Sequence, residues 1–116
     1  MKIGYARVST KDQELALQIA ALRKAGCKKI FQEKKTGATK ERPKLKKMIE
    51  QLRKEDVVVI WKLDRLGRSL KDLVQLVGEI QSRGAGLMSL GDHIDTVTPQ
   101  GKLTFHLFAA LAEFER

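Results

Sequence analysis

The stretch VVVIWKLDRLGRS, residues 57–69, decides the fold of this chain. Its first five residues form an uninterrupted apolar run rich in β-branched side chains, which is typical of a strand covered by helices on both faces. A polar turn with Gly67 follows, and a stripe of apolar residues at helical spacing begins just after it. The stripe consists of Leu70, Leu73, Val74, Val77 and Ile80. A buried strand that leads directly into an amphipathic helix predicts one unit of a parallel sheet.

Similar units open the chain. Residues 2–8 predict a strand that ends near Ser9, and the capping-box pattern of residues 10–13 then starts a helix. The apolar face of this helix consists of Leu15, Ile19 and Leu22. A short second strand is expected at residues 30–31, and Pro43 opens another helix after a basic loop. The apolar face of that helix consists of Leu45, Met48, Ile49 and Leu52.

Farther along, residues 87–90 predict a fourth strand, residues 91–99 a loop, and the stretch from about Gly101 a last helix. Strands and helices alternate with short links, so we expect an α/β fold in which a mainly parallel central sheet has helices on both faces. The 116 residues suffice for one domain. Ligands of such folds bind at the carboxyl ends of the strands.

The charge of the chain is unevenly distributed. A net charge of +9 at pH 7 favours a polyanionic partner or an anionic membrane surface, with a solvated lysine-rich surface as the alternative. Residues 34–47 contain seven Lys or Arg and one Glu, so +6 of the total lies in this one segment. A basic loop of this kind suits contact with a phosphate backbone.

The single cysteine, Cys27, excludes an internal disulfide and a zinc site built from cysteines, and so favours a reducing cytoplasm. No apolar run reaches the length of a membrane span, and the N-terminus lacks the apolar core of a signal peptide. We therefore expect a cytosolic protein.

Three predicted strand ends deliver reactive and charged side chains to one edge of the sheet. They comprise one candidate nucleophile, four arginines and one carboxylate: Ser9, Arg7, Arg42, Arg65, Arg68 and Asp64. Phosphoryl transfer needs positive charge around the non-bridging oxygens, and the planar arginine fork binds such oxygens bidentately. A serine among several arginines can therefore attack phosphorus, with the phosphate charge balanced by guanidinium groups instead of metal ions.

Each of these features has a plainer interpretation. Ser9 could serve only as a helix cap, and Arg65 and Arg68 could pair with Asp64 or Glu79 on the surface. A metal-dependent nuclease is a further alternative, although the arginines near its first carboxylate would oppose a bound cation. Its three candidate carboxylates are Asp64, Asp92 and Asp95. The sequence lacks G-x-x-x-x-G-K-[ST] and G-x-S-x-G, so neither a nucleotide cradle nor a hydrolase elbow is expected.

Several motifs together resemble the resolvase/invertase family of serine site-specific recombinases. They are YARVST at residues 5–10 followed by Gln13, TG at 36–37, RP at 42–43 and WKLDRLGRS at 61–69. The closing stretch, residues 94–116, resembles the DNA invertase branch more than the transposon resolvases. The resemblance covers essentially the whole chain. It implies the flavodoxin-like catalytic fold of resolvases, with a long C-terminal helix that is truncated here.

The resemblance also implies a mechanism. The implied catalytic residues are Ser9, Arg7, Arg42, Asp64, Arg65, Arg68, Gln18 and Arg116. Ser9 would attack the scissile phosphate and form a 5′-phosphoseryl bond, while the arginines of the first and third strand ends neutralise the phosphate. Asp64 would orient those guanidinium groups or assist proton transfer, and Arg42 would join when DNA arrives. Gln18 and Arg116 match further family positions, on the first and last helices.

The partner implied by the resemblance is double-stranded DNA, with no metal, no nucleotide cofactor and no membrane. In the full-length protein a homodimer would assemble into a synaptic tetramer that performs inversion, resolution or transposon-associated integration. Its expected location is the cytoplasm, in association with the nucleoid. The alternative from another class is a catalytically idle DNA-binding or assembly module of the same fold.

The sequence departs from the family pattern in two places. The helix after Arg42 usually carries a functional lysine, but residues 50–51 read Glu-Gln. The chain also stops within its last helix, without the helix-turn-helix domain of the family, so we expect residues 1–100 to form the core and residues 101–116 to begin a dimerisation helix.

That helix has more apolar surface than one stripe, which favours a dimer interface over burial within the monomer. The apolar residues are Leu103, Phe105, Leu107, Phe108, Leu111 and Phe114.

Overall fold

A computed structural model describes residues 1–8, 12–34 and 42–114 of the chain. The strands are β1 (Lys2–Val8), β2 (Lys29–Lys34), β3 (Val57–Ile60), β4 (Gly86–Ser89) and β5 (Ile94–Asp95). The helices are α1 (Asp12–Lys24), α2 (Pro43–Gln51), α3 (Leu70–Ser82) and α4 (Pro99–Phe114), with a 3-10 turn, η1 (Leu63–Arg65), between β3 and α3.

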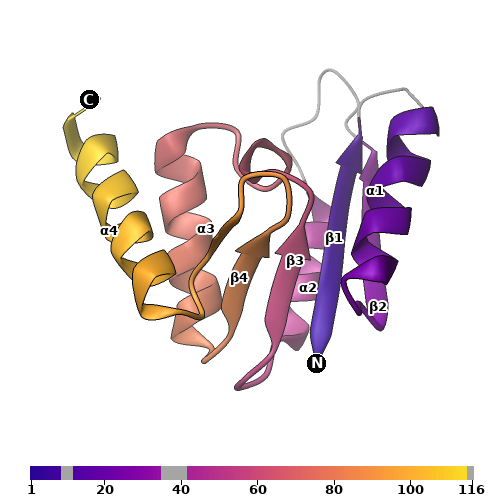
Figure 1. Cartoon of the computed structure of the whole chain (residues 1–116), viewed down its shortest axis with the longest axis horizontal. Coiled ribbons are helices and arrows are strands. Elements are labelled where there is room, and N and C mark those ends of the chain that lie inside the picture. The colour runs from indigo at the N-terminus through magenta and orange to yellow at the C-terminus, as the bar shows by residue number, and fades with distance from the viewer. Residues whose placement is uncertain (9–11, 35–41, 115–116) are drawn as a thin grey trace.

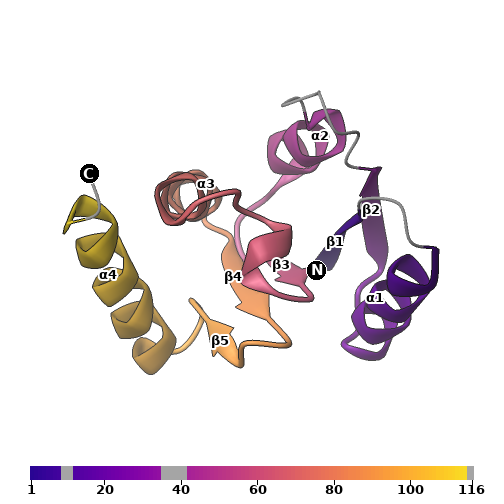
Figure 2. The same cartoon turned by 90° about the horizontal axis from the view of Figure 1, so that it is seen from above.

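The five strands form one sheet in the order β2-β1-β3-β4-β5 (Figure 1). The first four are parallel, and β5 pairs with β4 in the antiparallel direction. Figure 2 shows α2 and α3 on one face of the sheet and α1 on the other, with α4 beside α3. The predicted α/β fold with a mainly parallel sheet and helices on both faces is therefore confirmed.

The main core lies between the sheet and helices α2 and α3. Strand β3 contributes to both faces, because Val58 and Ile60 belong to this core while Val59 belongs to a smaller cluster under α1. All three side chains are fully buried, as the continuous apolar run predicted. Other fully buried members of the main core are Tyr5, Met48, Leu66, Ile80 and Leu87.

The sequence-based prediction was wrong at the distal edge of the sheet. Residues 91–99 were expected to form a loop, but Ile94–Asp95 forms β5. The ladder continues past β5, because the amide of Thr96 donates to the Leu87 carbonyl and the Thr96 hydroxyl accepts from the Leu87 amide, each at 2.8 Å. A two-residue strand carries no periodic signal, since its pairing depends on contacts with a strand already in place.

The last helix also begins earlier than expected, at Pro99 instead of about Gly101. Proline suits a first helical position, and the Thr98 hydroxyl accepts a hydrogen bond from the Gly101 amide at 3.1 Å as an N-cap does. Within α4, Phe105 joins the core, whereas Leu103 and Leu107 are 61% and 59% exposed. Burial within the monomer therefore does not account for the apolar surface at these two positions. No helix within the described residues is long and apolar enough to cross a bilayer.

Candidate active site

The carboxyl ends of the parallel strands meet at one edge of the sheet, at the top of Figure 1. Arg7 lies near the end of β1, and η1 with Arg68 follows β3. Of the predicted site residues, Ser9 and Arg116 lie outside the described part of the chain. The remaining six are described, and their contacts define the candidate site.

Arg7 connects the end of β1 to the segment after β3. Its side chain is buried, and Nη2 donates a hydrogen bond of 2.6 Å to the main-chain carbonyl of Asp64. From the other face, Gln18 on α1 donates from Nε2 to the Arg7 carbonyl at 3.3 Å. The Gln18 side chain is almost fully buried, and its Oε1 has no hydrogen-bond partner among the described residues. Gln18 thus supports the backbone that leads into Ser9.

Positive charge is concentrated at this edge. Burial lowers the pKa of the Arg7 guanidinium, and the charges of three further arginines lower it more, against an opposing effect of Tyr5. The three are Arg42, Arg65 and Arg68. Arg7 therefore lies close enough to each of the other three predicted arginines to be repelled by it, and an anionic ligand would relieve this repulsion.

Arg42 reaches from the start of α2 to the segment between η1 and α3. Nη1 donates to the carbonyl of Leu66, and Nη2 lies 3.0 and 3.3 Å from the two carboxylate oxygens of Asp72. The same carboxylate accepts the Arg68 amide at 2.8 Å. Arg42 thereby connects the start of α2 to the segment that carries Arg68.

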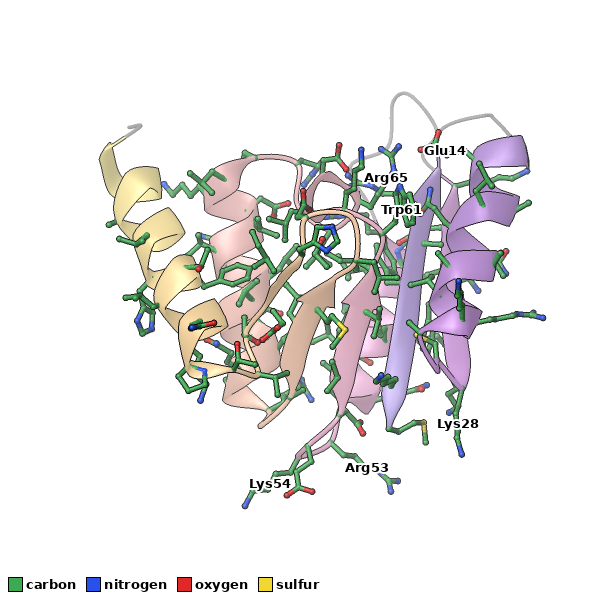
Figure 3. The ribbon with its side chains drawn as sticks, in the orientation of Figure 1. Glu14, Lys28, Arg53, Lys54, Trp61 and Arg65 are labelled. Carbon is green, nitrogen blue, oxygen red and sulfur yellow. The ribbon has the colours of Figure 1, made fainter. Side chains whose placement is uncertain are left out.

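Arg65 forms an ion pair with Glu14 of α1, and Figure 3 shows these side chains together at the upper edge. Its Nη1 also lies 3.8 Å from a carboxylate oxygen of Asp64. The Asp64 side chain is 69% exposed, so its carboxylate is available at this edge. Of the surface pairings that the plainer interpretation allowed for Arg65, the one with Asp64 is present and the one with Glu79 is absent from the described ion pairs.

Arg68 is exposed, and its guanidinium has no ion-pair partner within residues 1–8, 12–34 and 42–114. Its position depends on Gly67, where a Cβ atom would lie 2.6 Å from the Leu73 Cβ. Only glycine lets the turn pack this closely against α3. The turn thus presents one unpaired guanidinium beside three others.

Sequence reasoning missed the carboxylates that organise the site: Glu14, Glu33 and Asp72. Glu33 is buried at the end of β2, where it accepts from the Tyr5 hydroxyl and from two amides at the start of α2. Asp72 had a local signal, because Ser69-x-x-Asp72 matches the pattern of a helix start. Glu14 and Glu33 had none, since their partners lie far away in the sequence.

The geometry favours binding of a phosphate group over a metal site. In the described part of the chain, no group of three or more His, Cys, Asp or Glu side chains is arranged to hold a metal ion. Asp92 accepts from the Leu63 amide and the Ser89 hydroxyl, and Asp95 accepts from the amides of residues 97 and 98. Two of the three carboxylates considered for a metal-dependent nuclease are therefore engaged separately in turns, and the third, Asp64, lies beside Arg65.

Comparison with known proteins gives consistent matches. The family model described as "Resolvase, N terminal domain" matches residues 2–116. Serine recombinase gin of Escherichia phage Mu is 53% identical over 116 residues, which cover 100% of this chain and 60% of that protein. The Tn917 transposon resolvase of Enterococcus faecalis is 51% identical over 116 residues, which are 63% of its length.

Solved structures agree. The N-terminal catalytic domain of TP901-1 integrase superposes with a TM-score of 0.81 at 30% identity, covering 100% of this chain and 97% of that one. A resolvase family site-specific recombinase from Streptococcus pneumoniae gives a TM-score of 0.76 at 25% identity, covering 100% and 88%. The chain thus spans about three fifths of the curated relatives cited above but nearly all of the solved catalytic domain.

Proposed function

This chain belongs to the family of resolvase N-terminal domains that serine recombinases and DNA invertases share, and from that premise we propose that it cuts and rejoins DNA with Ser9 as the nucleophile. The supporting observation is the buried Arg7 with three further arginines close enough to repel it, at the sheet edge where β1 ends, one residue before Ser9. A scissile phosphate bound there would offset their repulsion. Charge stabilisation of this kind is the main catalytic requirement of phosphoryl transfer.

In the proposed step, the Ser9 oxygen bonds to phosphorus and gives up its proton, while the bond between phosphorus and the 3′ oxygen breaks. The 3′ oxygen leaves as a hydroxyl after taking a proton, and the 5′ phosphate remains as an ester of Ser9. Asp64, whose carboxylate is exposed beside Arg65, would orient that guanidinium or carry the proton. Attack of a 3′ hydroxyl on the seryl ester reverses the step and rejoins a strand, so the scheme needs no ATP.

The proposed partners are double-stranded DNA and a second copy of the chain. The +6 segment at residues 34–47 includes Arg42 in its sequence and would follow the phosphate backbone. Exposed Leu103 and Leu107 on α4 would contribute to a dimer interface. Residues 101–116 would then start the dimerisation helix beside a core of residues 1–100, and full-length dimers would pair into a synaptic tetramer in the nucleoid.

The test is to trap and locate the covalent bond. Duplexes with random flanks and one 3′-bridging phosphorothiolate are incubated with the chain, once with EDTA and once without. The phosphorothiolate traps the adduct, because the 3′ thiol that leaves attacks the seryl ester poorly. We expect a covalent protein–DNA adduct whose mass spectrum places the phosphate on Ser9 and which is absent from Ser9→Ala. Attachment to Tyr5, or cleavage that persists in Ser9→Ala and stops with EDTA, would refute the proposal.

A further inference from the structure

The junction between α2 and α3 contains an ion pair that the proposed chemistry does not use. The Nη2 atom of Arg42 lies 3.0 and 3.3 Å from the carboxylate oxygens of Asp72. The two side chains are only 12% and 23% exposed. An ion pair between a bidentate carboxylate and a mostly buried arginine has a more defined geometry than one on the open surface.

Asp72 is itself firmly placed. It lies in the first turn of α3, where its negative charge interacts favourably with the helix dipole. Its amide donates to the hydroxyl of the cap residue Ser69 at 3.0 Å, and its Oδ2 accepts the Arg68 amide at 2.8 Å. The carboxylate that receives Arg42 is therefore fixed by the same turn that presents Arg68.

Arg42, by contrast, has few other attachments. It is the N-cap residue of α2 and makes no side-chain cap hydrogen bond. A groove of about 690 Å³ lies between α2 and α3, and Arg42 is part of its lining. Besides Asp72, its guanidinium has one described partner, the carbonyl of Leu66. The pair with Asp72 is thus the charged connection that holds this side chain against the segment carrying Arg68.

These contacts leave part of the Arg42 guanidinium free. An arginine side chain has five N–H donors, and the bonds to Leu66 and Asp72 involve only Nη1 and Nη2. Within the described part of the chain Nε has no hydrogen-bond partner, so this donor remains for a phosphate. The negative charge of Asp72 also offsets part of the positive charge of Arg42 before any anion arrives.

We propose that Asp72 is a positioning residue that orients the Arg42 guanidinium beside Arg68 so that both can bind one DNA phosphate. This inference rests on the proposed function, since it assigns Asp72 a task in the same reaction. Asp72 contacts the arginine and not the DNA. Its loss therefore affects the rate of the chemical step more than the affinity for DNA.

Asp72→Asn is the main test, because the Asn oxygen can still accept the Arg68 amide while the charge is lost. On phosphorothiolate DNA at saturating concentration, we expect Asp72→Asn to lower the rate of Ser9 adduct formation by about tenfold or more. The affinity for the same DNA should stay equal or rise, because the variant carries one negative charge less. Asp72→Glu should restore part of the rate.

Two control variants and a double variant isolate the role. Ser69→Ala removes the cap of the same helix, and Glu79→Gln removes one negative charge from the same helix two turns away. Glu79→Gln should keep the wild-type rate, Ser69→Ala should lose much less rate than Asp72→Asn because the charge of Asp72 remains, and Arg42→Gln with Asp72→Asn should be no slower than Arg42→Gln alone. Equal losses in Asp72→Asn and Ser69→Ala, an unchanged rate in Asp72→Asn, or multiplied losses in the double variant would overturn the proposal.

A second measurement separates this inference from the proposed chemistry. In the ¹⁵N NMR spectrum of the DNA-free chain, we expect the Arg42 Nη2–H signals, which belong to the donors to Asp72, to exchange slowly with water in the wild type and in Glu79→Gln. In Asp72→Asn they should exchange at least about tenfold faster. If no Ser9 adduct forms in the wild type, the proposed function fails, and these signals still decide whether Asp72 holds Arg42. Equal exchange in the wild type and Asp72→Asn refutes the inference even if the adduct forms.

Discussion

The Tyr5 hydroxyl donates a 3.0 Å hydrogen bond to the Glu33 carboxylate, and the two side chains lie buried on neighbouring strands. The carboxylate also accepts the amides of Lys44 and Leu45 at 3.1 and 3.2 Å. A residue of β2 thus supplies the cap that α2 lacks locally, since Arg42 makes no side-chain cap bond. Arg42 directly precedes α2. By fixing the first turn of this helix, the Glu33 carboxylate therefore also fixes the backbone position of Arg42.

Glu33→Gln should destabilise the chain. One oxygen of the carboxylate would become an NH₂ group that cannot accept the helix amides, and the negative charge at the start of α2 would be lost. We expect the free energy of unfolding to fall by about 1–3 kcal/mol in urea titrations. Gln32→Glu, which changes an exposed residue of the same strand, is the control and should change it by less than about 0.5 kcal/mol. An unfolding free energy of Glu33→Gln equal to that of the wild type would contradict this role.

Tyr5 should make the fold sensitive to alkali. Burial, followed by the charge and hydrogen bond of Glu33, raises the pKa of the Tyr5 hydroxyl above its ordinary value of 10.0. The unfolded chain then loses the proton near pH 10 while the folded chain keeps it. Stability linked to Tyr5 is therefore complete below pH 10 and declines above it, by up to about 1.4 kcal/mol per pH unit.

Tyr5→Phe tests this directly. The variant should be less stable than the wild type by about 1 kcal/mol at pH 7, because a hydrogen bond is lost, and the difference should shrink as the pH rises above 10. Tyr5 is the only tyrosine of the chain, so phenolate absorbance reports its ionisation alone. A difference in stability that stays constant between pH 7 and pH 11 would show that Tyr5 ionises equally in both states.

Local sequence patterns predicted the strands and helices well but did not predict the ion pairs of the site. The first strand coincides with residues 2–8, and Pro43 opens α2 as expected, because alternation, apolar runs and proline act within a few residues. The pairs of Arg65 with Glu14 and of Arg42 with Asp72 join residues 51 and 30 positions apart. Such contacts depend on how α1 and α3 pack around the sheet, which no short window of sequence contains.

Arg68→Ala should separate chemistry from binding. The Arg68 guanidinium is exposed and unpaired among the described residues, so the variant should fold normally and lose one phosphate ligand. We expect the rate of Ser9 adduct formation to fall by about 100-fold or more, with a much smaller loss of DNA affinity. Lys71→Ala removes a neighbouring exposed cation and should keep the rate. Equal losses of rate and affinity in Arg68→Ala would make Arg68 a contact that only positions DNA.

The start of α4 should respond to acid through Asp95. Oδ1 of Asp95 accepts the amide of Thr98 at 2.8 Å, the Thr98 hydroxyl at 3.0 Å and the amide of Val97 at 3.0 Å. The hydrogen bond from the Thr98 amide is the main cause that lowers the pKa of the Asp95 carboxyl below its ordinary value, and the other two bonds add to it. Burial acts in the opposite direction. Gly101 closes the arrangement, since a Cβ atom there would lie 1.6 Å from the Asp95 carbonyl oxygen.

A lowered pKa in the folded state fixes the sign of the acid effect. The unfolded carboxyl takes up a proton near pH 3.8 while the folded one stays ionised, so the stability linked to Asp95 is present above that pH and is lost as the pH falls. Asp95→Asn keeps an oxygen that can accept the same three bonds and removes only the charge at the helix start. We expect it to be less stable than the wild type by about 0.3–1 kcal/mol at pH 7 and by a smaller margin at pH 2, measured by urea unfolding at both values. Asp95→Ala should stay less stable at both, because it also loses the acceptor. A gap between the wild type and Asp95→Asn that is the same at pH 2 as at pH 7 would mean that the charge of Asp95 contributes nothing to the start of α4.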